Sequence, residues 1–195
     1  MKRIKTTPAF SKEIFYVLKE DKEIKHGEYV RYGYTRKVAE RGSYDLNQKV
    51  GIWEFYDRDG ALEQRYNYDS NVLVFNPHKL SNKVRTQING KYEAIIPDEL
   101  PIFIGGVSKL AYLRMVRDYP LEARRAGIEG EIYISAVITT DGKLIDEKIE
   151  QTLGYGLDEE ALKSIRNIPD DFIPAKHDEQ DANVMILFPV FFRLD

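Results

Sequence analysis

Hydrophobic and polar residues alternate with a period of two between Glu131 and Ile138, a pattern typical of a β-strand with two different faces. Asp141-Gly142 follows, and this dipeptide favours the tight turn of a β-hairpin. Hydrophobic residues between Leu144 and Ile149 continue the chain as a second strand. The pattern therefore predicts an antiparallel hairpin in this part of the chain.

Helical spacing of hydrophobic residues precedes the hairpin. Residues 105–118 place hydrophobic side chains on one face, and Asp118 ends this predicted helix. A second helix has Pro120 at its first position and runs through LEARRA, with the arginines toward the negative end of the helix dipole. Gly127 ends it, because glycine readily takes the left-handed conformation of a helix C-terminus.

A further helical pattern follows the hairpin. Residues 157–168, LDEEALKSIRNI, place Leu157, Ala161, Leu162 and Ile165 on one face, and Asp158 is a candidate N-cap. The chain then closes with the strongly hydrophobic ANVMILFPVFFRL, which we predict to be a last strand. The second half thus reads as helix, hairpin, helix and strand.

The first half of the chain repeats itself at a constant offset of 24 residues. This offset pairs Gly27 with Gly51, Tyr29 with Trp53, Tyr32 with Tyr56, Val38 with Leu62 and Tyr44 with Tyr68. In the second unit Asp59-Gly60 lies between two aromatic-rich segments and supplies the positive φ of a tight turn. We therefore predict two hairpins in tandem, forming one meandering sheet stabilised by cross-strand aromatic pairs.

This half resembles the MORN-repeat variant common in bacteria, whose units read G-x-W-x-x-Y, a glycine turn, then leucine and a closing aromatic residue. The resemblance covers about residues 13–75. The first unit departs from the pattern, with Tyr29 at the tryptophan position and no glycine turn near Arg36. We interpret the aromatic residues as the core of the sheet, with a ligand-binding platform as the alternative.

Residues 77–98 are interpreted as a connector with room for one more short strand, and Pro97 and Pro101 mark its boundary. The predicted domains are a MORN-like β-hairpin repeat domain at 1–76, this connector, and a second domain at 99–195. The fold class is α+β, with an antiparallel hairpin-repeat sheet followed by a domain of two short helices on a small antiparallel sheet.

Composition and charge exclude several function classes. A formal net charge of −3 argues against a nucleic-acid partner, because a duplex binder needs a basic surface. The absence of cysteine removes disulfides, thiolate nucleophiles and cysteine-ligated metals. His26, His78 and His177 lack metal-binding spacing, and no catalytic motif is visible. We therefore expect no enzyme activity, no cofactor and no metal, with calcium binding by the acidic loop at 169–181 as a weaker alternative.

The second half resembles the C-terminal domain of the TonB family. YPLEARRAGIEGEIYISAVITTDGKL is similar to that family's tyrosine-proline, short helix, glycine, strand and D-G hairpin. GYGLDEEALKSI is similar to its second helix, and ILFPVFFRL to its last strand. LPIFIGGVSKLAYLRMVRDYP is similar to the helical lead-in of the subset from Bacteroidetes-type bacteria. The resemblance covers about residues 99–194.

In that family the domain is periplasmic, is not an enzyme, and grips a short extended segment of an outer-membrane transporter, the Ton box. The resemblance implies that such a segment adds as a strand beside the last strand. Pro189 gives an independent reason, because it has no amide to donate and so should lie in an edge strand. An exposed hydrophobic edge is a template for another strand.

The alternative is that this strand only fills the core, as one of its faces must. The candidate partner-binding residues are Val184, Met185, Ile186, Leu187, Phe188, Val190 and Phe191 of the last strand, with Val116, Arg117, Asp118 and Tyr119 ahead of the Pro120 helix.

The sequence departs from the family in three respects. The membrane helix and the proline-rich spacer of an energy transducer are missing from the sequence, so force transduction is not expected. The loop at 169–181 is acidic, whereas family members often have a basic, aromatic stretch there. We expect the periplasm or cell envelope if a signal or anchor precedes the printed sequence, and the cytoplasm if the chain is native as printed. The alternative function is a homodimeric structural protein that pairs the same edge with its own copy and takes no part in transport.

Overall fold

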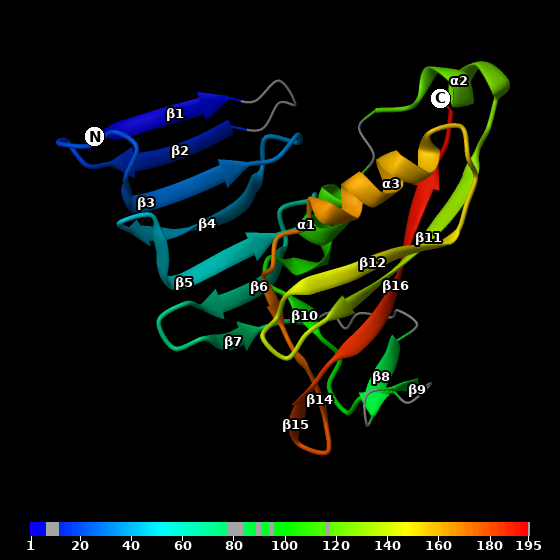
Figure 1. Ribbon diagram of the computed structural model, residues 1–195. Coiled ribbons are helices and arrows are strands. Elements are labelled where there is room, and N and C mark those ends of the chain that lie inside the picture. Colours follow the sequence, from blue (N-terminus) through cyan, green and yellow to red (C-terminus); the bar gives the residue numbers. More distant parts are fainter. Residues whose placement is uncertain (7–11, 78–83, 89–90, 94–95, 116–117, 195) are drawn as a thin grey trace. The chain divides into compact units, whose positions relative to one another are not determined.

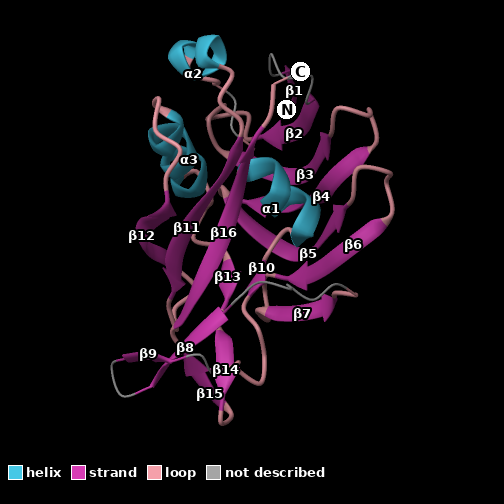
Figure 2. Ribbon diagram, turned by 90° about the vertical axis from the view of Figure 1, so that its right-hand side faces the viewer, coloured by secondary structure: helices cyan, strands magenta, loops and turns pink. Residues whose placement is uncertain are grey.

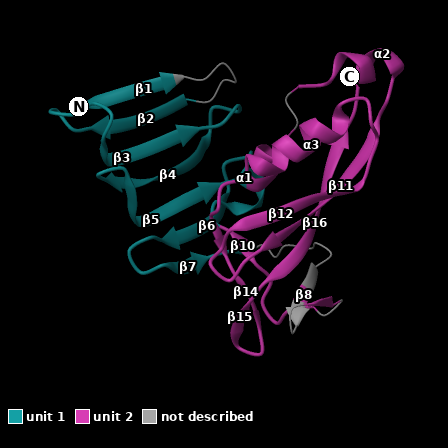
Figure 3. Ribbon diagram, viewed as in Figure 1, with its two compact units in different colours: residues 1–78, 104–109 teal, residues 79–103, 110–195 magenta. Residues whose placement is uncertain are grey.

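The computed structural model describes residues 1–6, 12–77, 84–88, 91–93, 96–115 and 118–194 (Figure 1). The chain forms two compact units (Figure 3). The first consists of Met1–His78 and Ile104–Lys109, and the second of Lys79–Phe103 and Leu110–Asp195. Helix α1 (Gly106–Leu113) therefore begins in the first unit and ends in the second.

The first unit is an antiparallel sheet of seven strands in chain order. Its strands are β1 (Lys2–Thr6), β2 (Lys12–Val17), β3 (Lys25–Tyr32), β4 (Val38–Asp45), β5 (Gln48–Tyr56), β6 (Leu62–Asn67) and β7 (Val72–Phe75). Every neighbouring pair is antiparallel, and β3–β4 and β5–β6 are the two hairpins that the tandem repeat predicts. The sheet is thus a meander without crossover connections.

The two predicted repeats adopt the same local structure. The amide of Gly60 donates to the carbonyl of Asp57, and 24 residues earlier the amide of Arg36 donates to that of Gly33. Arg36 takes the place of a turn glycine and has a φ of 61°, so it adopts the left-handed conformation in spite of its side chain. The missing glycine in the first repeat therefore does not prevent the turn.

An aromatic core lies on one face of this sheet, as predicted. Trp53 and Phe55 are fully buried, and the Tyr29 ring stacks on the Trp53 ring at a centroid distance of 5.3 Å. Lys25 lies over the Tyr29 and Tyr44 rings, and the repeat-equivalent Lys49 lies over the Trp53 and Tyr68 rings, all at 4.9–5.1 Å. A lysine that makes cation–π contacts with two aromatic rings thus recurs in each repeat.

The same face of the sheet has a polar region that holds residues 104–109. Glu40, 6 % exposed, accepts hydrogen bonds from Arg31 Nε at 2.7 Å and Lys109 Nζ at 3.0 Å. The buried carboxylate of Glu63 accepts from the Ser108 amide at 3.1 Å, and Gln64 Oε1 accepts from the Gly105 amide at 2.7 Å. The segment 104–109 is therefore part of the first unit, although it lies far from the repeats in sequence.

The second unit contains a five-stranded antiparallel sheet in the order β12-β11-β16-β8-β9. Its strands are β8 (Val84–Ile88), β9 (Lys91–Glu93), β11 (Gly130–Ile138), β12 (Leu144–Gln151) and β16 (Val184–Phe192). Helices α2 (Leu121–Ala126) and α3 (Leu157–Arg166) complete it with the short pairs β10 (Ile102–Phe103) with β13 (Phe172–Ile173) and β14 (Ala175–His177) with β15 (Gln180–Ala182). Two strands of the predicted connector, β8 and β9, thus belong to this sheet.

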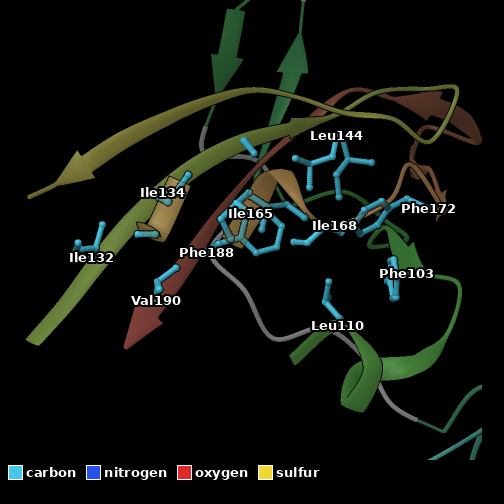
Figure 4. Close-up of a cluster of buried hydrophobic side chains, with 14 of the residues drawn as sticks. Phe103, Leu110, Ile132, Ile134, Leu144, Ile165, Ile168, Phe172, Phe188 and Val190 are labelled. Carbon is cyan, nitrogen blue, oxygen red and sulfur yellow. The ribbon is translucent and has the colours of Figure 1, made fainter. Parts of the chain in front are cut away.

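The core of the second unit lies on one face of this sheet (Figure 4). Alternate residues of the two central strands are at most 3 % exposed: Ile132, Ile134, Ala136, Ile138, Val184, Ile186, Phe188, Val190 and Phe192. Leu157, Ala161 and Ile165 of α3 are fully buried in the same cluster, which confirms the predicted helix face. The alternative stated for the last strand, that it fills the core, holds for one face of β16.

Three details of the helices differ from the sequence-based prediction. The helix predicted over 105–118 ends at Leu113. Pro120 is the N-cap of α2 and not its first residue, because its ψ of 135° lies outside the helical region. Asp158 does not cap α3. The N-cap is Gly156, and the Asp158 carboxylate accepts from the amides of Leu153 and Gly154, so it holds the loop before the helix.

The other local predictions for the second half are confirmed. Gly127 has a φ of 66° and ends α2. Gly142 has a φ of 76° in the β11–β12 turn, where its amide donates to Thr139. None of the helices in the described ranges is long and apolar enough to cross a membrane.

Candidate functional site

Strand β16 lies between β11 and β8 (Figure 2). It pairs with β11 along its whole length, from Val184 opposite Ile138 to Phe192 opposite Gly130. Among the described residues, β8 pairs with β16 at Val184, Met185 and Ile186. Within the described residues, the rest of the strand, Leu187–Phe192, has a ladder partner on one side, that of β11; we call this part the open edge.

The prediction that the last strand is an edge is thus wrong for its first third. Val184–Ile186 have strands on both sides, so their backbone groups are committed to the sheet. The segment that supplies β8 lies about a hundred residues away in sequence and was interpreted as connector, so no local pattern could reveal this pairing. The candidate role of Leu187, Phe188, Val190 and Phe191 stays a prediction.

Pro189 lies within the open edge, opposite Tyr133 of β11. A proline is tolerated inside a paired strand only where its missing amide would point away from the ladder. Amides of alternate residues point to the same side of a strand, so those of Leu187 and Phe191 share the side of Pro189. We infer that these two amides point toward the open side and away from β11.

The two faces of the open edge differ in exposure. Phe188, Val190 and Phe192 point into the core, whereas Phe191 on the opposite face is 53 % exposed. A strand added here would place alternate side chains beside the core and beside Phe191.

Tyr119 lies at the far end of β16. Its hydroxyl donates to the Ile128 carbonyl, and its ring meets the Phe192 ring edge-on at 5.8 Å. Burial, followed by Glu129, raises the pKa of the Tyr119 hydroxyl. The structure therefore brings Tyr119 together with the strand, as the candidate site requires.

The other residues predicted ahead of α2 are not brought to the strand by any contact that the structure records. Asp118 is exposed and forms an ion pair with Lys163 of α3, Nζ to Oδ2 3.9 Å. Val116 and Arg117 lie outside the described residues.

Arg114 is a residue of this region that sequence reasoning missed. Its guanidinium carbon lies 5.8 Å from the centroid of the Phe188 ring. Its Nε is buried and has no hydrogen-bond partner within the described residues. Burial is the cause that lowers the pKa of this guanidinium from its ordinary value. No pattern in the sequence indicates this environment of Arg114, because an arginine near a helix end is usually solvated.

A second polar group lies elsewhere in this unit, where Asp98, His177 and Asp178 bring ligand atoms within 4.8 Å of one another. His177 Nδ1 lies 3.9 Å from Asp98 Oδ2, and both carboxylates are exposed. The spacing of His177 relative to the other histidines predicted no metal ligand there, and its neighbour Asp98 is distant along the chain. Exposed carboxylates beside a histidine are common without a bound ion, so we assign no metal here.

Comparison with known proteins points to one family. The chain has no match among curated proteins and none among solved structures. A match to a family model covers residues 116–194, fewer than half of the 195 residues, and includes α2, the β11–β12 hairpin, α3 and β16. This part of the chain is similar to the Gram-negative bacterial TonB protein C-terminal.

Proposed function

We propose that the second unit is a non-catalytic protein-binding module of the cell envelope, and that it captures an extended segment of an outer-membrane transporter as an added strand on the open edge of β16. The TonB C-terminal family is a family of non-enzymatic interaction modules associated with the envelope, and its members interact with outer-membrane transporters. The observation that carries the proposal for this chain is the open edge itself, six residues whose ladder partner within the described ranges is β11.

The open edge has the chemistry that strand addition needs. Backbone groups on the open side supply hydrogen bonds without regard to sequence, and the alternating faces supply selectivity. On one face the row of Phe188, Val190 and Phe192 would continue onto the added strand. On the other face the exposed Phe191 ring offers hydrophobic surface. Pro189 has no amide to donate, so an added segment pairs with the amides of Leu187 and Phe191, which share its side of the strand.

The test is an amide-resolved NMR titration of the protein with ten-residue synthetic peptides. These copy the periplasmic N-terminal segments of outer-membrane transporters. The proposal predicts shifts at Leu187–Phe192 and at Tyr119. An absence of shifts there at millimolar peptide would contradict it.

A matched pair of variants separates backbone pairing from side-chain contact. Phe191→Pro removes both the ring and an amide on the open side, whereas Phe191→Ala removes the ring alone. We expect Phe191→Pro to weaken peptide binding at least about tenfold more than Phe191→Ala, because only the proline removes a ladder hydrogen bond and clashes with an incoming strand. Equal losses would mean that capture does not use the backbone. Ile186→Pro is unsuitable, because Ile186 is paired on both sides.

Self-association through the same edge is the alternative that the sequence left open. Sedimentation at the protein concentration of the titration decides between peptide capture and self-association. A monomer at that concentration excludes self-association. A dimer that dissociates when peptide is added would show that peptide and second copy use the same edge.

A further inference from the structure

Arg114 has an unusual environment for an arginine. The chain leaves α1 at this residue, and the guanidinium lies 5.8 Å from the Phe188 ring, over the core-facing side of the open edge. Its Nε is buried and lacks a hydrogen-bond acceptor within the described residues. A buried donor without an acceptor is disfavoured, and more so when it carries charge. The free protein therefore holds a cationic group prepared for an acceptor that the described residues do not supply.

An added strand would bring an acceptor to this position. The strand residue opposite Phe188 would have its β-carbon about 4.5–5.5 Å from that of Phe188. Its side chain would share the face of Phe188, whereas its two neighbours along the added strand would lie on the opposite face. A carboxylate on the Phe188 face reaches the guanidinium, because Arg114 lies over that same ring.

We propose that Arg114 is a specificity-determining residue of the open edge, and that it selects an extended segment with an acidic side chain opposite Phe188. The inference rests on the proposed function and names the chemistry of the partner. Carboxylate oxygens match the planar donor fork of arginine better than any other protein group. A neutral acceptor such as a glutamine would satisfy the donor without neutralising the charge.

The experiment uses the transporter-derived peptides of the titration above. Each is synthesised with a single Glu at every position in turn, and again with Gln at the same position. Binding to the full chain is measured by NMR at two salt concentrations. We expect one position at which the Glu peptide binds about tenfold more tightly than the Gln peptide, and we expect added salt to reduce this ratio.

Two variants connect the ratio to Arg114. Arg114→Met keeps a hydrophobic stem on Phe188 but removes the charge and the donor, so the ratio of Glu-peptide to Gln-peptide binding should fall to about one. Arg124→Met is the matched control, because Arg124 also lies over an aromatic ring, that of Tyr119 at 5.9 Å. The control should keep the ratio of the unchanged protein.

The outcomes separate the two claims. Peptides that bind at the open edge with no Glu position favoured would overturn the role of Arg114 and leave the proposed function standing. If the preference for Glu at one peptide position persists in Arg114→Met, the role of Arg114 would be overturned as well. If no peptide binds at the open edge, the proposed function and this inference fail together.

Discussion

The indole ring of Trp53 lies against the backbone of Gly42 on the neighbouring strand. A β-carbon at position 42 would stand 2.3 Å from a ring atom, a distance that real β-carbons do not show. The ring is held in place by a hydrogen bond from Nε1 to the Ser43 carbonyl, 3.1 Å, and by the Tyr29 ring stacked on it. Gly42 is therefore required by packing in the aromatic core of the first unit.

Gly42→Ala should destabilise the first unit by about 1–3 kcal/mol, because the Trp53 ring must leave its site to admit a methyl group. Urea unfolding followed by the fluorescence of Trp53, the single tryptophan, measures this directly. Gly33→Ala is the control, since a β-carbon there meets only Ala39 at 3.8 Å and should change the free energy of unfolding little. Equal effects of the two substitutions would show that the contact with Trp53 is not the cause.

Glu40 gives the first unit a stability that depends on pH. Burial alone would raise the pKa of Glu40, but Lys109 and Arg31 together lower it to about 2, from 4.5 for the ordinary side chain. The folded state thus binds the proton more weakly than the unfolded state. The stabilisation is present in full above pH 4.5 and is lost as the pH falls toward 2.

Glu40→Gln should therefore lower the free energy of unfolding by about 3 kcal/mol at neutral pH, and the difference from the unchanged protein should vanish as the pH approaches 2. Trp53 fluorescence in urea at a series of pH values checks this difference.

Glu54 has a pKa lowered to about 2 as well, through hydrogen bonds from Arg41, Tyr56 and Arg65 that offset its burial. Because Arg41 and Arg65 are about half exposed, Glu54→Gln should show the same pH window with a smaller amplitude.

Gly142 combines a left-handed backbone with a tight contact in the β11–β12 turn. Its φ is 76°, and a β-carbon would stand 2.1 Å from the Phe172 carbonyl oxygen. Gly142→Ala should cost about 1–3 kcal/mol more than Gly154→Ala, which has a φ of 71° and no atom within 4 Å of the added carbon. Hydrogen exchange of the amides at 130–151 measures the loss of stability in both variants. Gly154→Ala is the control and isolates the cost of backbone strain, about 1–2 kcal/mol.

Glu63 should be needed to hold residues 104–109 on the first unit. Glu63→Ala removes the acceptor of the Ser108 amide and hydroxyl, and it should cost about 1–3 kcal/mol. Glu63→Gln keeps one oxygen of the same shape and should cost less. The residue-specific readout is hydrogen exchange of the Ser108 amide. Unchanged protection of that amide in Glu63→Ala would show that other contacts hold the segment.

The sequence by itself determined the local elements of this protein. Turn residues such as Gly60 and Gly142, the 24-residue repeat of the first half and the hydrophobic periodicity around Ile134 and Ile165 all act over a few residues. They therefore predicted the hairpins, the buried face of α3 and the hydrophobic last strand. A helix boundary or cap depends on weaker preferences, and there Pro120 and Asp158 were placed wrongly by one or two positions.

Only the tertiary structure decided the surroundings of those elements. The pairing of β8 with Val184–Ile186, the ion pair of Lys109 with Glu40 and the position of Arg114 over Phe188 join residues about 70 to 100 positions apart. Such contacts are selected by the fit of complete faces and by the need to satisfy buried charges, and neither leaves a periodic signal in the chain. The open edge of β16 is thus a property of the folded sheet, although the strand that bears it can be identified from its sequence.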